Sequence, residues 1–303
     1  MRVLKYSFGL LLLSLICLEV CLRFAGFARP LLYKASGAGY EFVPNQTINL
    51  LGKTTHINAI GARGPDVSAV PANGLYRILV IGDSVANGGT QINDEQTWPL
   101  QLERLLRKTG INAQVVNAAS GGWAVQNEAA WLAEHGTLKA RMIILEVNQK
   151  DLGQPFARSD ILDNNVSFPT RYPLSALGGF VKRYVLPRVG LAPPSYDPGS
   201  TSGKFDPESF AMVLKAVDNI RTEAERHGAK FTILYWDVRD PPTTDVISAR
   251  NVLFSYADRH NIQVFRPYLN KVGQGERFFR DQIHPNAEGN IEIAKVLRDN
   301  ILQ

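Results

Sequence analysis

The chain has 303 residues, of which 45% are hydrophobic and 20% are charged, which is the composition of a folded protein with one large domain or two small ones. This composition argues against intrinsic disorder. The net charge is only +5, and no dense run of lysine or arginine is interleaved with aromatic residues, so the sequence gives little support for nucleic-acid binding.

Residues 1–29 predict a helix that enters a membrane. Two basic residues, Arg2 and Lys5, precede an apolar run that covers residues 7–22 and is interrupted by Glu19. As a helix this run spans about 24 Å, whereas the hydrocarbon core of a bilayer is about 30 Å thick. A helix that crosses the membrane must therefore continue beyond this run.

Two fates of this segment stay open. An uncleaved signal anchor fits the apolar character that continues to Phe27, with Arg23 reaching the far interface, and we favour this interpretation. A cleaved signal peptide fits the length of the apolar run and the small residues at positions 26 and 28. In both cases the basic end stays in the cytoplasm, and the chain after residue 30 lies in the periplasm or outside the cell, membrane-anchored or secreted.

Both cysteines, Cys17 and Cys21, lie in the N-terminal segment. The exported part therefore has no disulfide, no cysteine ligand for a metal and no thiol nucleophile. Its histidines and carboxylates lack the spacing of common metal sites, so we expect neither a metal ion nor another cofactor.

Downstream of this segment the chain has an irregular part and a regular part. Residues 30–75 are rich in Gly, Pro, Asn and Thr, and we expect them to form an irregular lead-in segment, with a hairpin, that packs on the main domain. From residue 76 onwards strand patterns alternate with helical patterns, which predicts an α/β domain at 76–303 with a five-stranded, mainly parallel sheet between helices. The predicted strands cover residues 76–81, 113–118, 141–147, 229–236 and 262–266, and the predicted helices cover 97–108, 124–135, 207–227, 245–260 and 286–302.

A long proline-rich insertion at about residues 149–205 interrupts this alternation. It contains seven prolines and no sustained periodicity, which predicts a loop without regular structure. Loops of this length inside compact domains are unusual and often functional.

Reactive groups stand near the ends of the predicted strands, where open α/β sheets place their sites. Ser84 follows the first strand in Gly-Asp-Ser, and a nucleophilic serine needs a base with an orienting carboxylate. His284 has an aspartate, Asp281, three residues before it in a loop. Gly122 and Asn148, after the second and third strands, offer a backbone and an amide donor for an oxyanion. Each residue alone could be a cap or a turn residue, but the combination favours acyl-transfer chemistry.

The motifs that contain these residues, "GDSV", "NAASGGW", "EVNQKD" and "DQIHP", resemble those of the SGNH, or GDSL, hydrolase family. The resemblance implies a flavodoxin-like three-layer α/β/α sandwich with strand order 2-1-3-4-5. It also implies that Ser84 attacks an ester carbonyl, that His284 acts as base and then as acid, and that Asp281 orients His284. The N–H groups of Ser84 and Gly122 and the amide of Asn148 would hold the oxyanion.

The resemblance covers roughly residues 76–302. The segments "INAIGARGPD" and "TWPLQLERLL" are similar to a membrane-anchored subset of the family. One position departs from the family pattern, which usually has an aspartate after the third-block asparagine where this chain has Gln149. Asp151 is a candidate for a structural substitute.

We therefore expect a serine esterase that acts outside the cytoplasm and removes short acyl groups from a glycan or another ester. An O-acyltransferase that uses the same triad on extracellular polysaccharide is an alternative, and a non-catalytic binding domain is a third. A nucleophile elbow of the Gly-x-Ser-x-Gly type is disfavoured, because Ala86 occupies its last position. The expected partners are an ester-bearing small molecule or acylated glycan and, through the N-terminal segment, the membrane. We expect no nucleic acid and no obligate protein partner.

Overall fold

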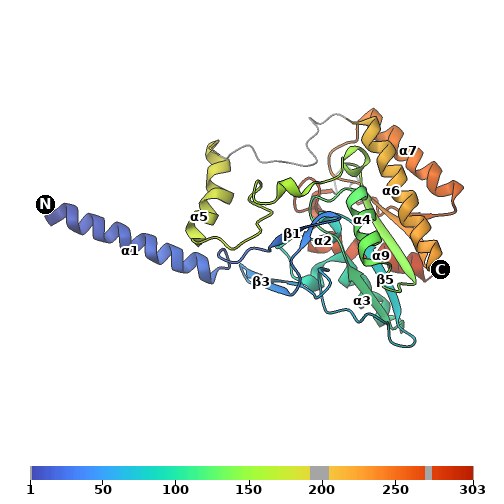
Figure 1. The fold of residues 1–303 in the computed structure, drawn as a ribbon, viewed down its shortest axis with the longest axis horizontal. Coiled ribbons are helices and arrows are strands. Elements are labelled where there is room, and N and C mark those ends of the chain that lie inside the picture. The colour runs from blue at the N-terminus through green and yellow to red at the C-terminus, as the bar shows by residue number, and fades with distance from the viewer. Residues whose placement is uncertain (1, 192–204, 270–274, 303) are drawn as a thin grey trace.

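The centre of the molecule is a five-stranded parallel sheet (Figure 1). The structure is a computed structural model, and it describes residues 2–191, 205–269 and 275–302. The strands lie in the order β6-β5-β7-β8-β9, which is 2-1-3-4-5 when they are counted along the chain, so the predicted fold class is confirmed. Their bounds are β5 Tyr76–Ile81, β6 Ala113–Asn117, β7 Met142–Asn148, β8 Lys230–Trp236 and β9 Gln263–Phe265.

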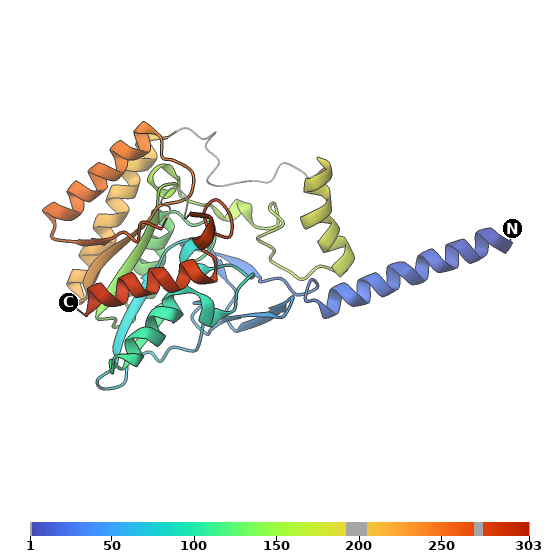
Figure 2. The ribbon, with the colours of Figure 1, turned by 180° about the vertical axis from the view of Figure 1, so that it is seen from behind.

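Helices cover both faces of this sheet (Figures 1 and 2). They are α3 Trp98–Lys108, α4 Val125–His135, α6 Pro207–Arg226, α7 Thr244–Arg259 and α9 Ala287–Ile301. α3 and α9 pack together on one face, and α4, α6 and α7 cover the other. Along β5, Ile78 and Val80 belong to the core under α3 and α9, whereas Leu79 and Ile81 belong to the opposite core. This alternation explains why the strand is apolar throughout, since both of its faces are buried.

The lead-in segment forms two antiparallel hairpins and joins the edge of the sheet. The first hairpin pairs β1 (Tyr33–Ser36) with β2 (Gly39–Phe42), and the second pairs β3 (Gln46–Leu50) with β4 (Lys53–Ile57). After β4, the backbone N–H of Arg63 donates to the carbonyl of Asn117 in β6 at 2.8 Å. Aromatic side chains of β1 and β2 enter the same core as the helices α4 and α6.

The proline-rich insertion contains a helix that its sequence pattern did not predict. A continuous helical run is made of α5 (Ala176–Phe180), the π-helical turn η4 (Val181–Val185) and the 3₁₀ turn η5 (Leu186–Val189). Two further 3₁₀ turns are η2 (Asp151–Gly153) and η3 (Ser159–Ile161). Residues 192–204, with three of the seven prolines, lie outside the described residues.

The reason for this helix is a cap supplied by a distant segment. The carboxylate of Glu19 accepts the backbone N–H groups of Ala176 at 3.0 Å and Leu177 at 2.8 Å, and the hydroxyl of Ser175 accepts that of Gly178 at 3.0 Å. The first N–H groups of a helix have no partner inside the helix, so such acceptors favour its start. A contact over more than 150 residues cannot be seen in a local pattern.

Helix α1 (Arg2–Phe24) projects away from the domain (Figures 1 and 2). Its stretch Tyr6–Phe24 has a mean hydropathy of 2.0 and is long and apolar enough to cross a membrane, a property that membrane anchors and signal sequences share. Among the residues that the structure describes, the contacts of α1 with the rest of the chain come from its C-terminal end. There Gly26, with φ of 96°, approaches β3 so closely that a Cβ would lie 1.9 Å from the Asn49 carbonyl oxygen. Three short helices lie in the connecting loops: α2 Ser84–Asn87, η1 Asp94–Gln96 and α8 Gly275–Phe278.

Candidate active site

Ser84 is the first residue of α2, directly beyond the carboxyl end of β5. The chain turns there because Asp83 caps α2, with its carboxylate accepting the N–H of Val85 at 2.7 Å. A Cβ on Gly82 would lie 2.9 Å from the Cβ of Glu146, so only glycine fits where β5 meets its neighbour. The Gly-Asp-Ser sequence thus places a half-buried hydroxyl at the carboxyl ends of the strands.

The structure brings the three predicted side chains of the triad together. His284 Nε2 lies 2.9 Å from Ser84 Oγ, although the two residues are 200 positions apart. His284 Nδ1 lies 2.8 Å from Oδ2 of Asp281 and 2.9 Å from its Oδ1. The hydroxyl, the imidazole and the carboxylate therefore form one line of hydrogen bonds.

The carboxyl group of Asp281 is held ionised by its own turn. Burial alone would raise its pKa, but the backbone N–H groups of His284 and Ile283, together with the imidazole of His284, outweigh burial and lower the pKa to about 2. The two N–H groups donate to Oδ1 at 2.8 and 2.9 Å. Three residues of turn are enough for the carboxylate to curl back to the imidazole, so both the ionisation and the orientation are built locally.

This turn is also tied to the sheet by a residue that the sequence analysis missed. The indole N–H of Trp236, the last residue of β8, donates to the carbonyl of Ile283 at 2.7 Å. The ring packs against Phe279, with centroids 4.9 Å apart. A tryptophan at a strand end is a weak signal in the sequence, since the acceptor of its N–H becomes visible only in three dimensions.

Gly122 lies in the loop after β6, and this loop borders Ser84. Gly122 has φ of 78°, and a Cβ there would lie 2.8 Å from the hydroxyl oxygen of Tyr40. Tyr40 donates that hydroxyl to the carbonyl of Gly121 at 2.9 Å, and Gln154 Nε2 donates to the carbonyl of Gly122 at 3.0 Å. A Cβ on Gly121 would lie 3.8 Å from the Cβ of Ser84. Both the lead-in and the insertion therefore fix this loop beside the serine.

Asn148 is the last residue of β7 and is buried next to the same point. Its side-chain amide donates to Oδ2 of Asp83 at 3.2 Å, and this oxygen is 3.4 Å from Ser84 Oγ. Its backbone N–H donates to Oδ2 of Asp151 at 2.7 Å. Asp151 thus supplies a carboxyl oxygen to the backbone of Asn148, three residues before it, in a chain that has Gln149 directly after the asparagine.

Three further carboxyl groups near Asp83 are fully buried: Asp151, which the sequence analysis named as a candidate structural substitute, and Glu128 and Glu146, which it did not single out. Burial, followed by the charges of the neighbouring acids including Asp83, raises the pKa of each well above its usual range. Within the part of the chain that the structure describes, neither carboxyl oxygen of Glu128 has a hydrogen-bond partner. A neutral, protonated form is the one that such surroundings tolerate.

Replacing Glu128 with glutamine is expected to flatten the dependence of stability on pH. Because the pKa is raised in the native state, the folded protein keeps a proton that the unfolded chain releases, and the free energy of unfolding falls as pH rises above the usual range of a glutamate. We expect the Glu128→Gln variant to lose roughly 1–4 kcal/mol less than the wild type between about pH 5 and 8. Urea unfolding at several pH values measures this loss.

The matched control for this variant is Glu134→Gln, because Glu134 is exposed on the same helix, α4. The control should keep the pH dependence of the wild type. An unchanged dependence in Glu128→Gln as well would show that Glu128 is not the group that holds the proton.

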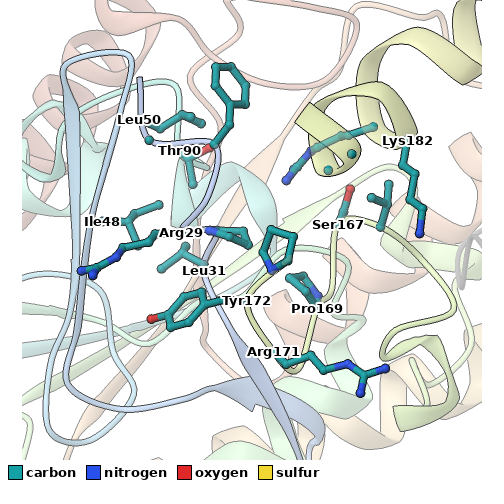
Figure 3. A pocket seen from close by; sticks show the side chains of 18 of the residues that line it. Arg29, Leu31, Ile48, Leu50, Thr90, Ser167, Pro169, Arg171, Tyr172 and Lys182 are labelled. Carbon is teal, nitrogen blue, oxygen red and sulfur yellow. The ribbon is translucent and has the colours of Figure 1, made fainter. Parts of the chain in front are cut away.

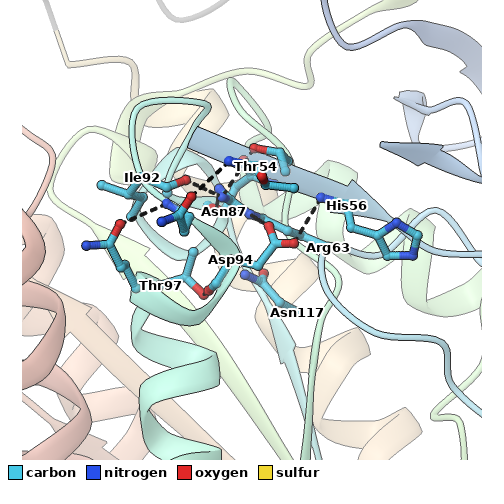
Figure 4. A network of polar contacts seen from close by, with 12 residues as sticks. Thr54, His56, Arg63, Asn87, Ile92, Asp94, Thr97 and Asn117 are labelled. Atoms are coloured by element: carbon cyan, nitrogen blue, oxygen red, sulfur yellow. Dashed lines mark hydrogen bonds and ion pairs between the residues drawn. The ribbon is translucent and has the colours of Figure 1, made fainter. Parts of the chain in front are cut away.

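Arg63 in the lead-in segment holds the loop that carries the serine (Figure 4). Its guanidinium is buried and donates to Asp94 Oδ1 at 2.7 Å, to the carbonyl of Asn87 at 2.6 Å and to the carbonyl of Ile92 at 2.7 Å. Asn87 ends α2, so one side chain joins the helix of Ser84 to the loop beyond it. In the sequence this residue is an arginine between small residues in "IGARGP", and the pattern does not predict which groups accept its hydrogen bonds.

One group of side chains offers ligand atoms for a metal ion, away from the serine. Atoms of Glu41, Glu134 and His135 lie within 4.8 Å of one another. Glu41 already forms ion pairs with Lys34 at 2.8 Å and with His135 at 3.0 Å. These pairs account for the cluster without an ion.

One family model and several solved structures are similar to this chain. The model of the GDSL-like lipase/acylhydrolase family matches residues 80–290. The chain is similar in structure to a catalytic mutant of Axe2, an acetylxylan esterase from Geobacillus stearothermophilus, with 13% identity, a TM-score of 0.48 and coverage of 77% of this chain and 96% of that chain. A search of curated protein sequences found no match.

Two other solved structures have comparable similarity. The psychrotrophic esterase EstA from Pseudoalteromonas sp. has 13% identity and a TM-score of 0.47, with coverage of 75% of this chain and 97% of that chain. A member of the lipolytic protein G-D-S-L family from Veillonella parvula has 14% identity and a TM-score of 0.45, with coverage of 76% and 99%.

Proposed function

The chain belongs to the GDSL-like lipase/acylhydrolase family, and from this premise we propose that it is a serine esterase of the SGNH type. Ser84 is the nucleophile, His284 is the general base and acid, and Asp281 orients the imidazole. The observation that carries the proposal is the pair of hydrogen bonds at 2.9 and 2.8 Å that joins the three side chains.

The reaction proceeds in two halves. Ser84 Oγ attacks the ester carbonyl carbon while His284 Nε2 takes the hydroxyl proton, and the imidazolium then gives this proton to the departing alcohol. Water then attacks the resulting acyl-enzyme and loses a proton to His284, which passes this proton to Ser84 Oγ as the bond to the acyl group breaks and the acid is released. Asp281 stays ionised throughout, because its pKa is about 2, and it stabilises the imidazolium.

The oxyanion of each tetrahedral intermediate requires donors that are fixed in advance. We assign this role to the N–H groups of Ser84 and Gly122 and to the side-chain amide of Asn148. One amide hydrogen of Asn148 is directed to Asp83 at 3.2 Å, and an amide nitrogen carries a second hydrogen that can serve the oxyanion.

We further propose that α1 is an uncleaved anchor and that the domain acts outside the cytoplasm. The contacts of the segment support retention, since Glu19 caps α5 and the ring of Phe27 packs edge-to-face on Phe180 with centroids 5.2 Å apart. Cleavage after Ala28 would remove both. Acylated glycans at the cell surface are ester-bearing polymers within reach of an anchored domain, so short acyl groups on a glycan are the proposed substrate.

Labelling with a fluorophosphonate tests the nucleophile. Ser84 Oγ should displace fluoride from phosphorus, and intact-protein mass spectrometry should show one adduct on the native full chain. We expect no adduct on Ser84→Ala and normal labelling of Ser248→Ala, a control on α7. Equal labelling of Ser84→Ala, or none on the native wild type, would remove the esterase proposal. Release of acetate from an acetylated glycan, compared with p-nitrophenyl esters of increasing length, then tests the substrate class.

A further inference from the structure

Residues 171–191, which we call the collar, form a basic and partly apolar surface of the insertion. The collar contains four basic residues and no acidic one. Its helical part, 176–189, is about 21 Å long at 1.5 Å per residue. Several of its large hydrophobic side chains are exposed, among them Leu174 with 99%, Leu191 with 70% and Val189 with 59% of their surface accessible. No feature of the proposed esterase reaction requires these side chains.

The collar is fastened to the end of α1 by polar and aromatic contacts. Beside the cap that Glu19 provides, Arg23 Nη2 donates to the carbonyl of Leu174 at 2.8 Å. Phe27 packs edge-to-face on both Phe180 and Tyr184, with centroids 5.2 and 5.6 Å apart. These contacts hold the collar at a fixed position along the axis of α1, which is the level of Glu19 and Arg23.

That level corresponds to the surface of a membrane that α1 crosses. The stretch Tyr6–Phe24 is about 28 Å long as a helix, close to the roughly 30 Å of a hydrocarbon core, so its C-terminal end lies at the interface. Glu19 precedes Phe24 by five residues, or about 8 Å, and its charge, paired with Arg23 at 2.7 Å, places the boundary between hydrocarbon and headgroups near the cap of α5, with the last residues of α1 beyond this boundary. From there α5 runs across the direction of α1 and not alongside it (Figures 1 and 2).

The cations around the collar are spread and do not converge on one point. A cavity of about 670 Å³ between the collar and the lead-in segment is lined by apolar residues such as Leu31 and Leu50 and by the basic residues Arg29, Arg171 and Lys182. Figure 3 shows that the charged ends of these three basic side chains point in different directions. A single phosphate would require convergent donors, whereas a layer of many headgroups is complementary to cations that are spread out.

We propose that the collar is an interfacial element that lies among the headgroups of the outer leaflet, where its basic side chains bind anionic lipids and Leu174 and Val189 insert at the acyl boundary. The proposal rests on the anchoring of α1 proposed above. Interfacial helices combine basic and apolar side chains in this way, and each cation near an anionic surface adds to the attraction. The α1 anchor and the collar together would fix the orientation of the domain on the membrane.

The test attaches an environment-sensitive fluorophore to single cysteines of the full chain in nanodiscs of phosphatidylcholine and phosphatidylglycerol. The background variant is Cys17→Ala with Cys21→Ala, which removes both native thiols. Labels are placed on the collar at Leu174→Cys and Val189→Cys, and a control label is placed at Val252→Cys. Val252 is also an exposed apolar residue, with 45% of its surface accessible, but it lies on α7, at the other end of the domain (Figure 1).

Lipids with a nitroxide on the headgroup should quench both collar labels at least about twofold more than the control label, because interfacial elements lie at headgroup depth. The double variant Lys182→Glu with Arg188→Glu replaces two collar cations and should reduce the difference in quenching between the collar labels and the control label. Nanodiscs of neutral lipid should reduce this difference as well. The matched charge reversal Lys108→Glu with Lys215→Glu should leave it unchanged. Added inorganic phosphate should not reduce the quenching of the collar labels, because the proposal involves a layer of headgroups and not a site for a single anion.

A label at Leu12→Cys separates failure of the collar from failure of the anchor. If a nitroxide deep in the acyl chains quenches this label while the collar labels behave like Val252, α1 spans the membrane and the collar proposal is wrong. If the Leu12 label is not quenched either, the anchoring is wrong, and the collar proposal is overturned with it, while the esterase assignment stands on its own test.

Discussion

Replacing His284 with alanine is expected to lower kcat for ester hydrolysis by about 10⁵–10⁶, because the serine loses the base that accepts its proton and the acid that protonates the leaving group. Replacing Asp281 with asparagine should lower kcat by about 10⁴, since the amide removes the negative charge and favours the wrong tautomer of His284. Initial rates with a p-nitrophenyl ester measure both effects.

The control for these variants is His227→Ala, a solvent-exposed histidine whose partner is Glu223 at 3.0 Å on the surface of α6. It should keep the rate of the wild type.

The pH profile adds a second readout. Because the pKa of Asp281 is about 2, its carboxylate is lost only in strong acid, so Asp281 should add no step of its own to the loss of kcat/KM above about pH 3. Two separate steps above about pH 3 would contradict the ionised state of Asp281.

The triad could be predicted from the sequence because its chemistry is tied to strand ends. Parallel strands place their carboxyl ends at one edge, so Ser84 and Asn148 were expected at the same edge once β5 and β7 were recognised as buried strands, and the structure pairs these two strands directly. The Asp281–His284 pair is local, because His284 follows Asp281 by three positions. The order of the five strands came from the resemblance and not from periodicity, which fixes the type of an element but not its neighbours.

Residues that act through distant contacts could not be predicted in the same way. The acceptors of Arg63 are the backbone carbonyls of Asn87 and Ile92, and backbone atoms leave no mark in a residue pattern. The helix 176–189 depends on a carboxylate more than 150 positions away, at Glu19. The three buried acids look like ordinary surface glutamates or aspartates until the packing around them is known.

The position of Asp151 shows how a departure from a family pattern can be understood in physical terms. Gln149 cannot supply a carboxylate, but the 3₁₀ turn η2 begins at Asp151 and brings its Oδ2 to 2.7 Å from the backbone nitrogen of Asn148. The side chain of Gln149 instead donates to the carbonyl of Asp240 at 2.9 Å. The asparagine is therefore held from the turn and not from the adjacent residue.

Replacing Arg63 with methionine is expected to lower the free energy of unfolding by roughly 3–5 kcal/mol, because the change removes one partner of a buried ion pair and leaves the other uncompensated. The distance between Nε and Asp94 Oδ1 is 2.7 Å, and the arginine side chain has no exposed surface. The carbonyls of Asn87 and Ile92 lose their donor as well. Urea unfolding of the full chain in detergent measures the loss.

The conservative variant Arg63→Lys separates charge from shape. A lysine keeps the positive charge near Asp94. Its ammonium group cannot replace the planar guanidinium, which donates to a carboxylate and to carbonyls on several sides. We therefore expect the free energy of unfolding to fall by roughly 1–3 kcal/mol. The control Arg158→Met removes a pair with Asp160 in which both side chains are exposed, and it should cost less than about 1 kcal/mol. Arg63 joins the end of α2 to the loop beyond it, so fluorophosphonate labelling of Ser84 in Arg63→Lys should also be slower under conditions where the variant is fully folded. If labelling keeps the wild-type rate while stability falls, Arg63 stabilises the lead-in segment without positioning the serine.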